Sequence, residues 1–131
     1  MTPMLEIKNL SMKYHTINEE TDSIENLSFT VDEGEFISIV GPSGCGKSTL
    51  LSSIAGLLQP SAGEIYIDGE RITSTSDRIG YMFQQDDLFE WRTILQNVIL
   101  GLEIKHRMGP EARKKVEDML RRYGLYEFKD Y

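Results

Sequence analysis

The chain has 131 residues, of which 40% are hydrophobic and 27% are charged, an ordinary composition for a soluble globular protein. Its formal net charge of −7 argues against general binding to the nucleic acid backbone, which requires basic surfaces. No apolar run approaches the roughly 18–20 residues that span a bilayer, and residues 1–10 lack the regions of a signal peptide. We therefore expect a cytosolic protein of about one domain.

Two strands are predicted near the N-terminus. Residues 5–14 alternate apolar and polar side chains, which is typical of a strand with one wet face. Residues 24–31 form the second strand, with Leu27, Phe29 and Val31 on one face. Residues 15–22 are polar and predict the loop between the two strands, and residues 32–35 predict a turn.

A nearly continuous apolar run at residues 36–40 predicts a strand buried inside a parallel sheet. The next nine residues fit the phosphate-loop pattern G-x-x-x-x-G-K-[ST], and residues 48–58 predict a helix. A strand, a glycine-rich loop and a helix in this order form the context that the pattern requires. The loop residues are Gly41, Pro42, Ser43, Gly44, Cys45, Gly46, Lys47, Ser48 and Thr49.

The residue types in this loop suit a nucleoside triphosphate. Successive backbone N–H groups form an anion-binding nest, and the following helix N-terminus also favours anions. The pattern assigns Lys47 to the β- and γ-phosphates and Ser48 to Mg²⁺, and we place Thr49 on the α-phosphate side. The open alternative is a glycine-rich turn that binds nothing.

Cys45 is the only cysteine, so it forms no internal disulfide, as expected in a reducing compartment. Its thiol is either tuned by the positive potential of the loop or is simply a small side chain that fits.

Beyond the first helix, residues 64–67 and 79–83 predict two short strands, and residues 84–87 predict a polar loop. Asp68 and Gly69 follow the first of these strands and predict a hairpin turn. An apolar run that ends in an aspartate also fits a metal-binding position, which is the alternative for Asp68.

Two helices are predicted in the last third of the chain. Thr93 can cap the first, with Gln96 as its capping-box partner. Pro110 suits the first position of the second helix, and Gly124 suits its end. The apolar stripe of the second helix comprises Val116, Met119, Leu120 and Tyr123. Its basic residues form either a solvated face or a surface for anionic lipids or a partner; they are Arg113, Lys114, Lys115, Arg121 and Arg122.

With these motifs in view, the chain resembles the ATP-binding subunit of an ABC transporter. The resemblance is carried by Tyr14, the phosphate loop and residues 60–65, 80–84 and 88–93. The last segment, which contains Trp91, is most similar to importers of nitrate, sulfonates and taurine. The implied fold is the α/β P-loop NTPase fold of ABC ATPase type, incomplete, with an antiparallel β subdomain beside a partial parallel sheet and the start of a helical subdomain.

The resemblance also implies roles for individual residues. Tyr14 matches the aromatic residue that stacks on adenine, with packing on the core as its alternative. Gln84 matches the Q-loop glutamine that contacts Mg²⁺ or the attacking water, and Gln85 is the competing candidate. The region of Leu88, Phe89 and Trp91 meets the transmembrane permease subunit in this family, with ordinary core packing as the alternative.

The implied organisation is an ATP-binding core at residues 1–92 and the beginning of the helical subdomain at residues 93–131. The family's signature motif and Walker B aspartate do not occur in the sequence, so we expect a truncated chain that binds ATP and Mg²⁺ without turnover.

The implied partners are permease subunits, a second ATP-binding subunit arranged head to tail and, indirectly, a solute-binding protein. The implied location is the inner face of the cell membrane. A non-catalytic docking fragment and a different P-loop enzyme, such as a small-molecule kinase, are the alternatives.

Overall fold

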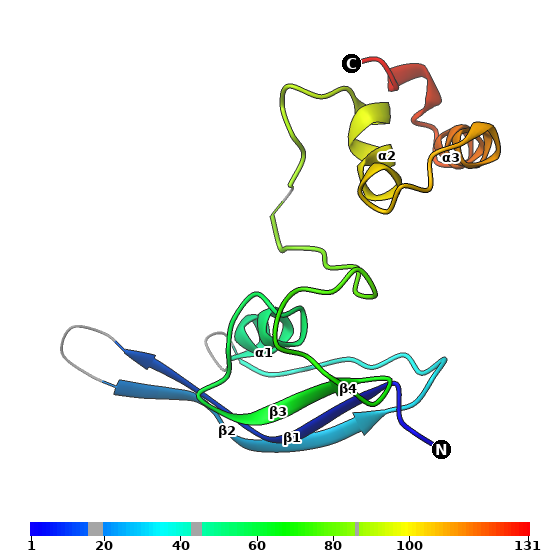
Figure 1. Cartoon of the computed structure of the whole chain (residues 1–131). Coiled ribbons are helices and arrows are strands. Elements are labelled where there is room, and N and C mark those ends of the chain that lie inside the picture. Colours follow the sequence, from blue (N-terminus) through cyan, green and yellow to red (C-terminus); the bar gives the residue numbers. More distant parts are fainter. Residues whose placement is uncertain (16–19, 43–45, 86) are drawn as a thin grey trace. The chain divides into compact units, whose positions relative to one another are not determined.

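The computed structural model describes residues 1–15, 20–42, 46–85 and 87–131, with the side chains of residues 14–22 left undescribed. The chain divides into two compact units, Met1–Tyr81 and Met82–Tyr131. The first unit contains a sheet and one helix, and the second contains two helices and a short 3-10 helix (Figure 1).

The sheet of the first unit has four antiparallel strands in the order β2-β1-β3-β4. Three of these strands confirm the strands predicted at residues 5–14, 24–31 and 64–67. The loop predicted at residues 15–22 is shorter than expected, because β2 already begins at residue 20. The strands are β1 (Leu5–His15), β2 (Glu20–Val31), β3 (Ala62–Ile67) and β4 (Glu70–Arg71).

The alternation predicted for β1 is interrupted by a β-bulge at Lys8 and Asn9. Both residues are exposed, whereas Ile7 and Leu10 on either side are buried. Asn9 has a φ of 49°. Opposite the bulge, Gly63 of β3 has a φ of 88°, and a Cβ atom there would lie 2.3 Å from the Asn9 carbonyl oxygen. The bulge shifts the alternation by one residue, so both halves of β1 turn their apolar side chains to one core.

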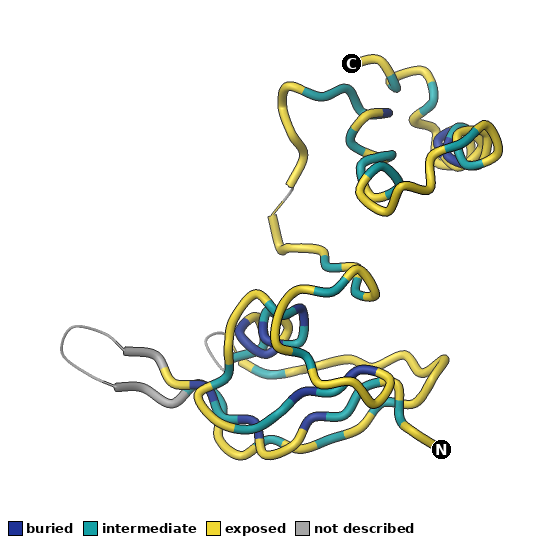
Figure 2. The backbone as a smooth tube through the Cα atoms, in the orientation of Figure 1, coloured by how far each residue is buried: buried dark blue, intermediate teal, exposed yellow. Residues whose placement is uncertain are grey.

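Helix α1 (Lys47–Ile54) covers this sheet. Its Leu50 packs in one cluster with Ile7 and Leu10 of β1 and Ile65 of β3, and the buried positions of helix and sheet face one another in Figure 2. The helix is shorter than the predicted range of 48–58. Gly56 adopts a φ of 78° just beyond its end, the left-handed conformation that commonly stops a helix.

The turn between β3 and β4 confirms the predicted hairpin. Asp68 and Gly69 have φ values of 50° and 79°, the positive values that a two-residue type I′ turn requires. The Asp68 N–H group also donates a hydrogen bond of 2.9 Å to the Met4 carbonyl oxygen. Asp68 is therefore a turn residue, as the hairpin interpretation expected.

The strands predicted at residues 36–40 and 79–83 are wrong. Neither segment pairs with a strand, and Phe36 and Val40 are 94% and 91% exposed. In the described ranges, every strand belongs to the antiparallel sheet and no parallel pair occurs. An apolar run becomes a buried strand only where neighbouring strands take up its backbone hydrogen bonds.

The second unit is built from α2 (Ile94–Ile104), α3 (Pro110–Arg122) and the 3-10 helix η1 (Tyr126–Phe128). The predicted capping box is confirmed: the Gln96 N–H donates to Thr93 Oγ1 at 3.1 Å, and the Thr93 N–H donates to Gln96 Oε1 at 2.9 Å. Pro110 opens α3 as predicted, and Gly124 follows it with a φ of 72°.

The core of the second unit is the cluster of Leu95, Val116 and Leu120. The other two residues of the predicted α3 stripe, Met119 and Tyr123, are exposed, so only half of that stripe is core. Within the described part of the chain, no helix combines the length and the apolar character needed to cross a membrane.

Candidate nucleotide-binding site

Gly46 joins the phosphate loop to α1 and lies against β2. Its φ of 95° and ψ of 10° are left-handed, and its carbonyl oxygen accepts the first hydrogen bond of the helix, from the Leu50 N–H at 2.9 Å. A Cβ atom at this position would lie 2.6 Å from the Ser23 carbonyl oxygen. Glycine is therefore required here for two independent reasons, backbone conformation and close approach.

Lys47 is the first residue of α1 and is half-buried. Its Nζ atom donates a hydrogen bond to the Gly41 carbonyl oxygen, so the ammonium group reaches back to the start of the loop. The helix N-terminus adds a dipole that favours anions at the same place. Lys47, whose charge the motif assigns to the phosphates, therefore links the two ends of the loop: its backbone starts α1, and its ammonium group lies beside Gly41.

The next two residues of α1 face different surroundings. Ser48 is exposed in the first turn, where its hydroxyl is accessible to a metal ion. Thr49 is only 7% exposed, and its carbonyl oxygen accepts a hydrogen bond from Ser53 Oγ at 2.9 Å. Of the two hydroxyls that the sequence assigns to the nucleotide, the Ser48 hydroxyl is the accessible one.

A cavity of about 270 Å³ adjoins the loop and the helix. Its walls are mainly apolar and include one acidic residue, Glu25, beside the basic Lys47, so the cavity offers a triphosphate little net charge to bind. This cavity therefore gives no independent indication of where phosphates bind. The lining residues are Ser23, Ile24, Glu25, Leu27, Ile39, Val40, Gly46, Lys47 and Leu50.

Several predicted site residues lie outside the described part of the structure. Ser43, Gly44 and Cys45 are among them, as is the side chain of Tyr14. The backbone of Tyr14 belongs to β1 and is paired with Thr21 of β2. The roles predicted for these four residues stay predictions.

Gln84 and Gln85 are exposed and belong to the second unit, whereas Lys47 belongs to the first. The approach of either glutamine to the phosphate loop therefore also stays a prediction.

Three of the exposed apolar side chains of the second unit lie close together in sequence, those of Leu88, Phe89 and Trp91. The rings of Phe89 and Trp91 lie 4.8 Å apart between centroids. Trp91 is 79% exposed, so it is not part of the core of this unit. We call these three residues the Trp91 patch.

Asn97 of α2 holds the segment that carries the Trp91 patch. Its Oδ1 atom accepts a hydrogen bond from the Phe89 N–H at 2.9 Å, and its Nδ2 atom donates to the Phe89 carbonyl oxygen at 3.2 Å. The neighbouring Arg92 forms an ion pair of 3.0 Å with Glu103. The sequence interpretation missed Asn97, because an asparagine inside a helix carries no distinctive signal.

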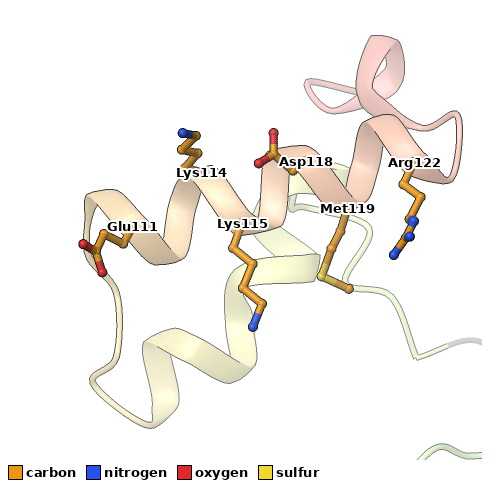
Figure 3. A pocket seen from close by; sticks show the side chains of 6 residues that line it. All are labelled: Glu111, Lys114, Lys115, Asp118, Met119 and Arg122. Atoms are coloured by element: carbon orange, nitrogen blue, oxygen red, sulfur yellow. The ribbon is translucent and has the colours of Figure 1, made fainter.

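A second shallow hollow, of about 480 Å³, lies on α3 (Figure 3). Lys114 and Asp118 extend to one side of the helix, and Lys115 and Met119 extend to the other. The mixed charges are those of a solvated helix face, one of the two interpretations left open by the sequence. The lining residues are Glu111, Lys114, Lys115, Asp118, Met119 and Arg122.

Comparison with known proteins places this geometry in a family. Residues 24–131 match the family described as ABC transporter. The ABC transporter ATP-binding protein YtlC of Bacillus subtilis (strain 168), which is described as uncharacterized, is 42% identical over 94% of this chain and 47% of its own length. The taurine import ATP-binding protein TauB of Roseobacter denitrificans is 39% identical over 96% of this chain and 47% of its own length.

Among solved structures, the ATP-binding cassette MJ0796, in a dimeric post-hydrolysis state bound to ADP and Pi, superposes with a TM-score of 0.84 and 36% identity. The match covers 98% of this chain and 61% of that one. The chain spans about half the length of the curated relatives it matches. On the strength of its phosphate loop, its fold and these matches, the chain belongs to the ABC transporter family.

Proposed function

We propose that this chain is an ATP-binding part of the nucleotide-binding subunit of an ABC-type importer. The observation that carries the proposal is the position of Lys47, whose ammonium group meets the Gly41 carbonyl oxygen at the N-terminus of α1. Two comparisons support it: the relative TauB is named as an import ATP-binding protein, and the similar MJ0796 cassette binds ADP and Pi.

The loop residues fit ATP with Mg²⁺. The residues from Gly41 to Thr49 other than Pro42 would supply backbone N–H groups, and Lys47 would supply the charge that meets the β- and γ-phosphates. The exposed Ser48 hydroxyl suits Mg²⁺, with Gln84 as a second contact. Tyr14 would stack on adenine. Bound Mg²⁺ would neutralise charge on the phosphates and orient them.

The same proposal assigns residues 1–92 to the ATP-binding core and residues 93–131 to the beginning of the helical subdomain. The sequence contains no signature motif and no Walker B aspartate, so the isolated chain is proposed to bind ATP without turning it over. Hydrolysis needs groups around the metal and the attacking water that these 131 residues do not supply.

The proposed cargo of the whole transporter is a small anion such as nitrate, a sulfonate or taurine, since TauB is named for taurine import. The proposed partners are permease subunits that contact the Trp91 patch, a second ATP-binding subunit arranged head to tail, and indirectly a solute-binding protein. The proposed location is the cytoplasmic face of the cell membrane.

The Trp91 patch favours a second candidate function, that of a docking module that binds a membrane subunit without using ATP. Its apolar side chains are exposed, and the Phe89 backbone within the patch is fixed by two hydrogen bonds with the Asn97 side chain. Contiguous exposed apolar side chains commonly mark interaction sites. A docking module would bind its partner equally well with and without ATP.

Thermal unfolding with Mg²⁺-ATP tests the proposal. Ligand at 100 times its dissociation constant stabilises a protein by about 2.7 kcal/mol, which raises the melting temperature measurably. We expect this rise in the wild-type chain and its loss in Lys47→Ala. Lys115→Ala, which removes the same charge from the exposed face of α3, is the matched control and should keep it. Equal rises in all three proteins would contradict the proposal.

A further inference from the structure

Tyr81 is the last residue of the first unit and is held there by a hydrogen bond. Its hydroxyl lies 3.0 Å from the Ser52 Oγ atom of α1. Tyr81 is half-buried, whereas its neighbours Gly80 and Met82 are exposed. The Ser52 contact therefore lies at the point where the chain leaves the first unit, three residues before Gln84.

The segment that leads to Tyr81 is fixed to the same helix end at two further points. Gln59 Nε2, just beyond α1, donates a hydrogen bond of 2.7 Å to the Thr73 carbonyl oxygen. Gly56 lies so close to Ser74 that a Cβ atom at position 56 would be 2.3 Å from the Ser74 carbonyl oxygen. The chain approaching Tyr81 thus follows α1 and its continuation, although it forms no strand there.

Ser52 and Lys47 belong to the same short helix. Ser52 lies five positions beyond Lys47, a rise of roughly 7.5 Å along a helix axis. An α-helix of this length moves as one body, because its backbone hydrogen bonds link successive turns. A displacement of the phosphate end of α1 would therefore move the Ser52 hydroxyl with it.

We propose that Tyr81 is a positioning residue: through its hydrogen bond to Ser52, it makes the course of the segment that carries Gln84 depend on the nucleotide bound at the other end of α1. The proposal rests on the proposed function, because it requires nucleotide at the phosphate loop. Tyr81 itself touches neither nucleotide nor metal in this scheme.

Trp91 provides the readout, since it is the only tryptophan of the chain and lies ten residues beyond Tyr81. Its fluorescence, excited selectively, is recorded while Mg²⁺-ATP is added to the full chain. Affinity is measured separately with a fluorescent nucleotide analogue. We expect a saturable change in Trp91 emission in the wild-type chain, and a loss of most of its amplitude in Tyr81→Phe. The dissociation constant should change by less than about fivefold, the lower end of typical coupling between sites.

Variants of Ser52, the hydrogen-bond partner of Tyr81, and a control variant at Tyr66 make the test more specific. Ser52→Ala should reproduce Tyr81→Phe, and the double variant should lose no more than either, because both remove the same contact. Ser52→Thr keeps a hydroxyl and should restore the response. Tyr66→Phe removes a tyrosine hydroxyl that bonds to Glu64 within the sheet and should behave as wild type.

The outcomes separate this proposal from the proposed function. No binding of the nucleotide analogue to the wild-type chain would mean that the proposed function fails, and the present proposal with it. Normal nucleotide binding with no emission change in the wild-type chain would overturn the present proposal alone. So would a full emission change in both Tyr81→Phe and Ser52→Ala.

Discussion

Gly46 shows how closely the phosphate loop is adapted to its surroundings. The motif requires a glycine before Lys47 so that the backbone can approach phosphates. The structure adds a second requirement, because the Ser23 backbone of β2 occupies the space of a Cβ atom at position 46. A residue of the predicted nucleotide site is therefore also a close contact between α1 and the sheet.

Gly46→Ala should lower the free energy of unfolding by at least about 1–3 kcal/mol, the cost of holding a non-glycine residue in a sparsely populated conformation, with the clash against Ser23 added. The loss of unfolding free energy is measured by urea denaturation. Gly34→Ala is the matched control: Gly34 has a φ of 81° but no atom within 4 Å of the added Cβ, so it should lose less. Equal losses would mean that the contact with β2 contributes nothing.

The motif predicts which residues make up the loop, because it specifies residue types at fixed spacing, and their roles toward the nucleotide stay predictions. It did not predict the contact of Gly46 with Ser23 or the bond of Ser52 to Tyr81. Both join residues more than 20 positions apart whose types are common on protein surfaces, so no local pattern marks them. The Tyr14 stack and the Gln84 contact stay predictions.

Helix α2 illustrates what local signals can specify. Its start is fixed by the Thr93 capping box, which the spacing of Thr93 and Gln96 predicted. Its first N–H groups are also satisfied from the C-terminal end of the chain: those of Ile94 and Leu95 donate to the carbonyl oxygens of Tyr131 and Lys129, each at 2.9 Å. The sequence could predict the capping box, but not the hydrogen bonds from the C-terminal end of the chain, because these depend on tertiary packing.

Asn97→Ala should destabilise the second unit by about 1–3 kcal/mol, because it leaves the polar groups of Phe89, Arg92 and Thr93 without their partner amide. The measurement is amide exchange of residues 88–92, which should become faster. Gln85→Ala, at an exposed amide side chain, serves as control and should leave this exchange unchanged. Unaltered exchange in Asn97→Ala would show that the segment is held by other contacts.

The two wrongly predicted strands share one cause. Residues 36–40 and 79–83 have the apolar composition of buried strands, yet neither is paired in the structure. Composition reports what a segment can do if neighbours are present, whereas strand formation depends on those neighbours. The presence of the three α-helices and of the β3–β4 hairpin was predicted correctly, because their hydrogen bonds close within a few residues, although α1 ends earlier than predicted.

For the molecule as a whole, the exposed apolar run at residues 36–40 is the feature that we expect to promote association between chains. Unpaired apolar backbone attracts other chains, so we expect the isolated chain to be marginally stable and to associate. Amide exchange should show residues 36–40 poorly protected relative to β1 and the Ile24–Val31 part of β2. A monodisperse monomer with strong protection across residues 36–40 would contradict this expectation.

The whole-molecule question is which part of the chain receives the triphosphate. Two of the places that carry positive charge are the N-terminus of α1 with Lys47 and the hollow on α3 with Lys114, Lys115 and Arg122. The first offers backbone N–H groups beside the ammonium. The second offers only side chains interspersed with Glu111 and Asp118, so we assign the nucleotide to α1.

Amide exchange with and without Mg²⁺-ATP tests this assignment most directly, because it locates the ligand without assuming a site. Bound phosphates should slow exchange in the first turn of α1, residues 46–50, and leave α3 unchanged. The slowing should vanish in Lys47→Ala. Protection that instead appears along α3, or no ATP-dependent change in residues 46–50, would contradict the account.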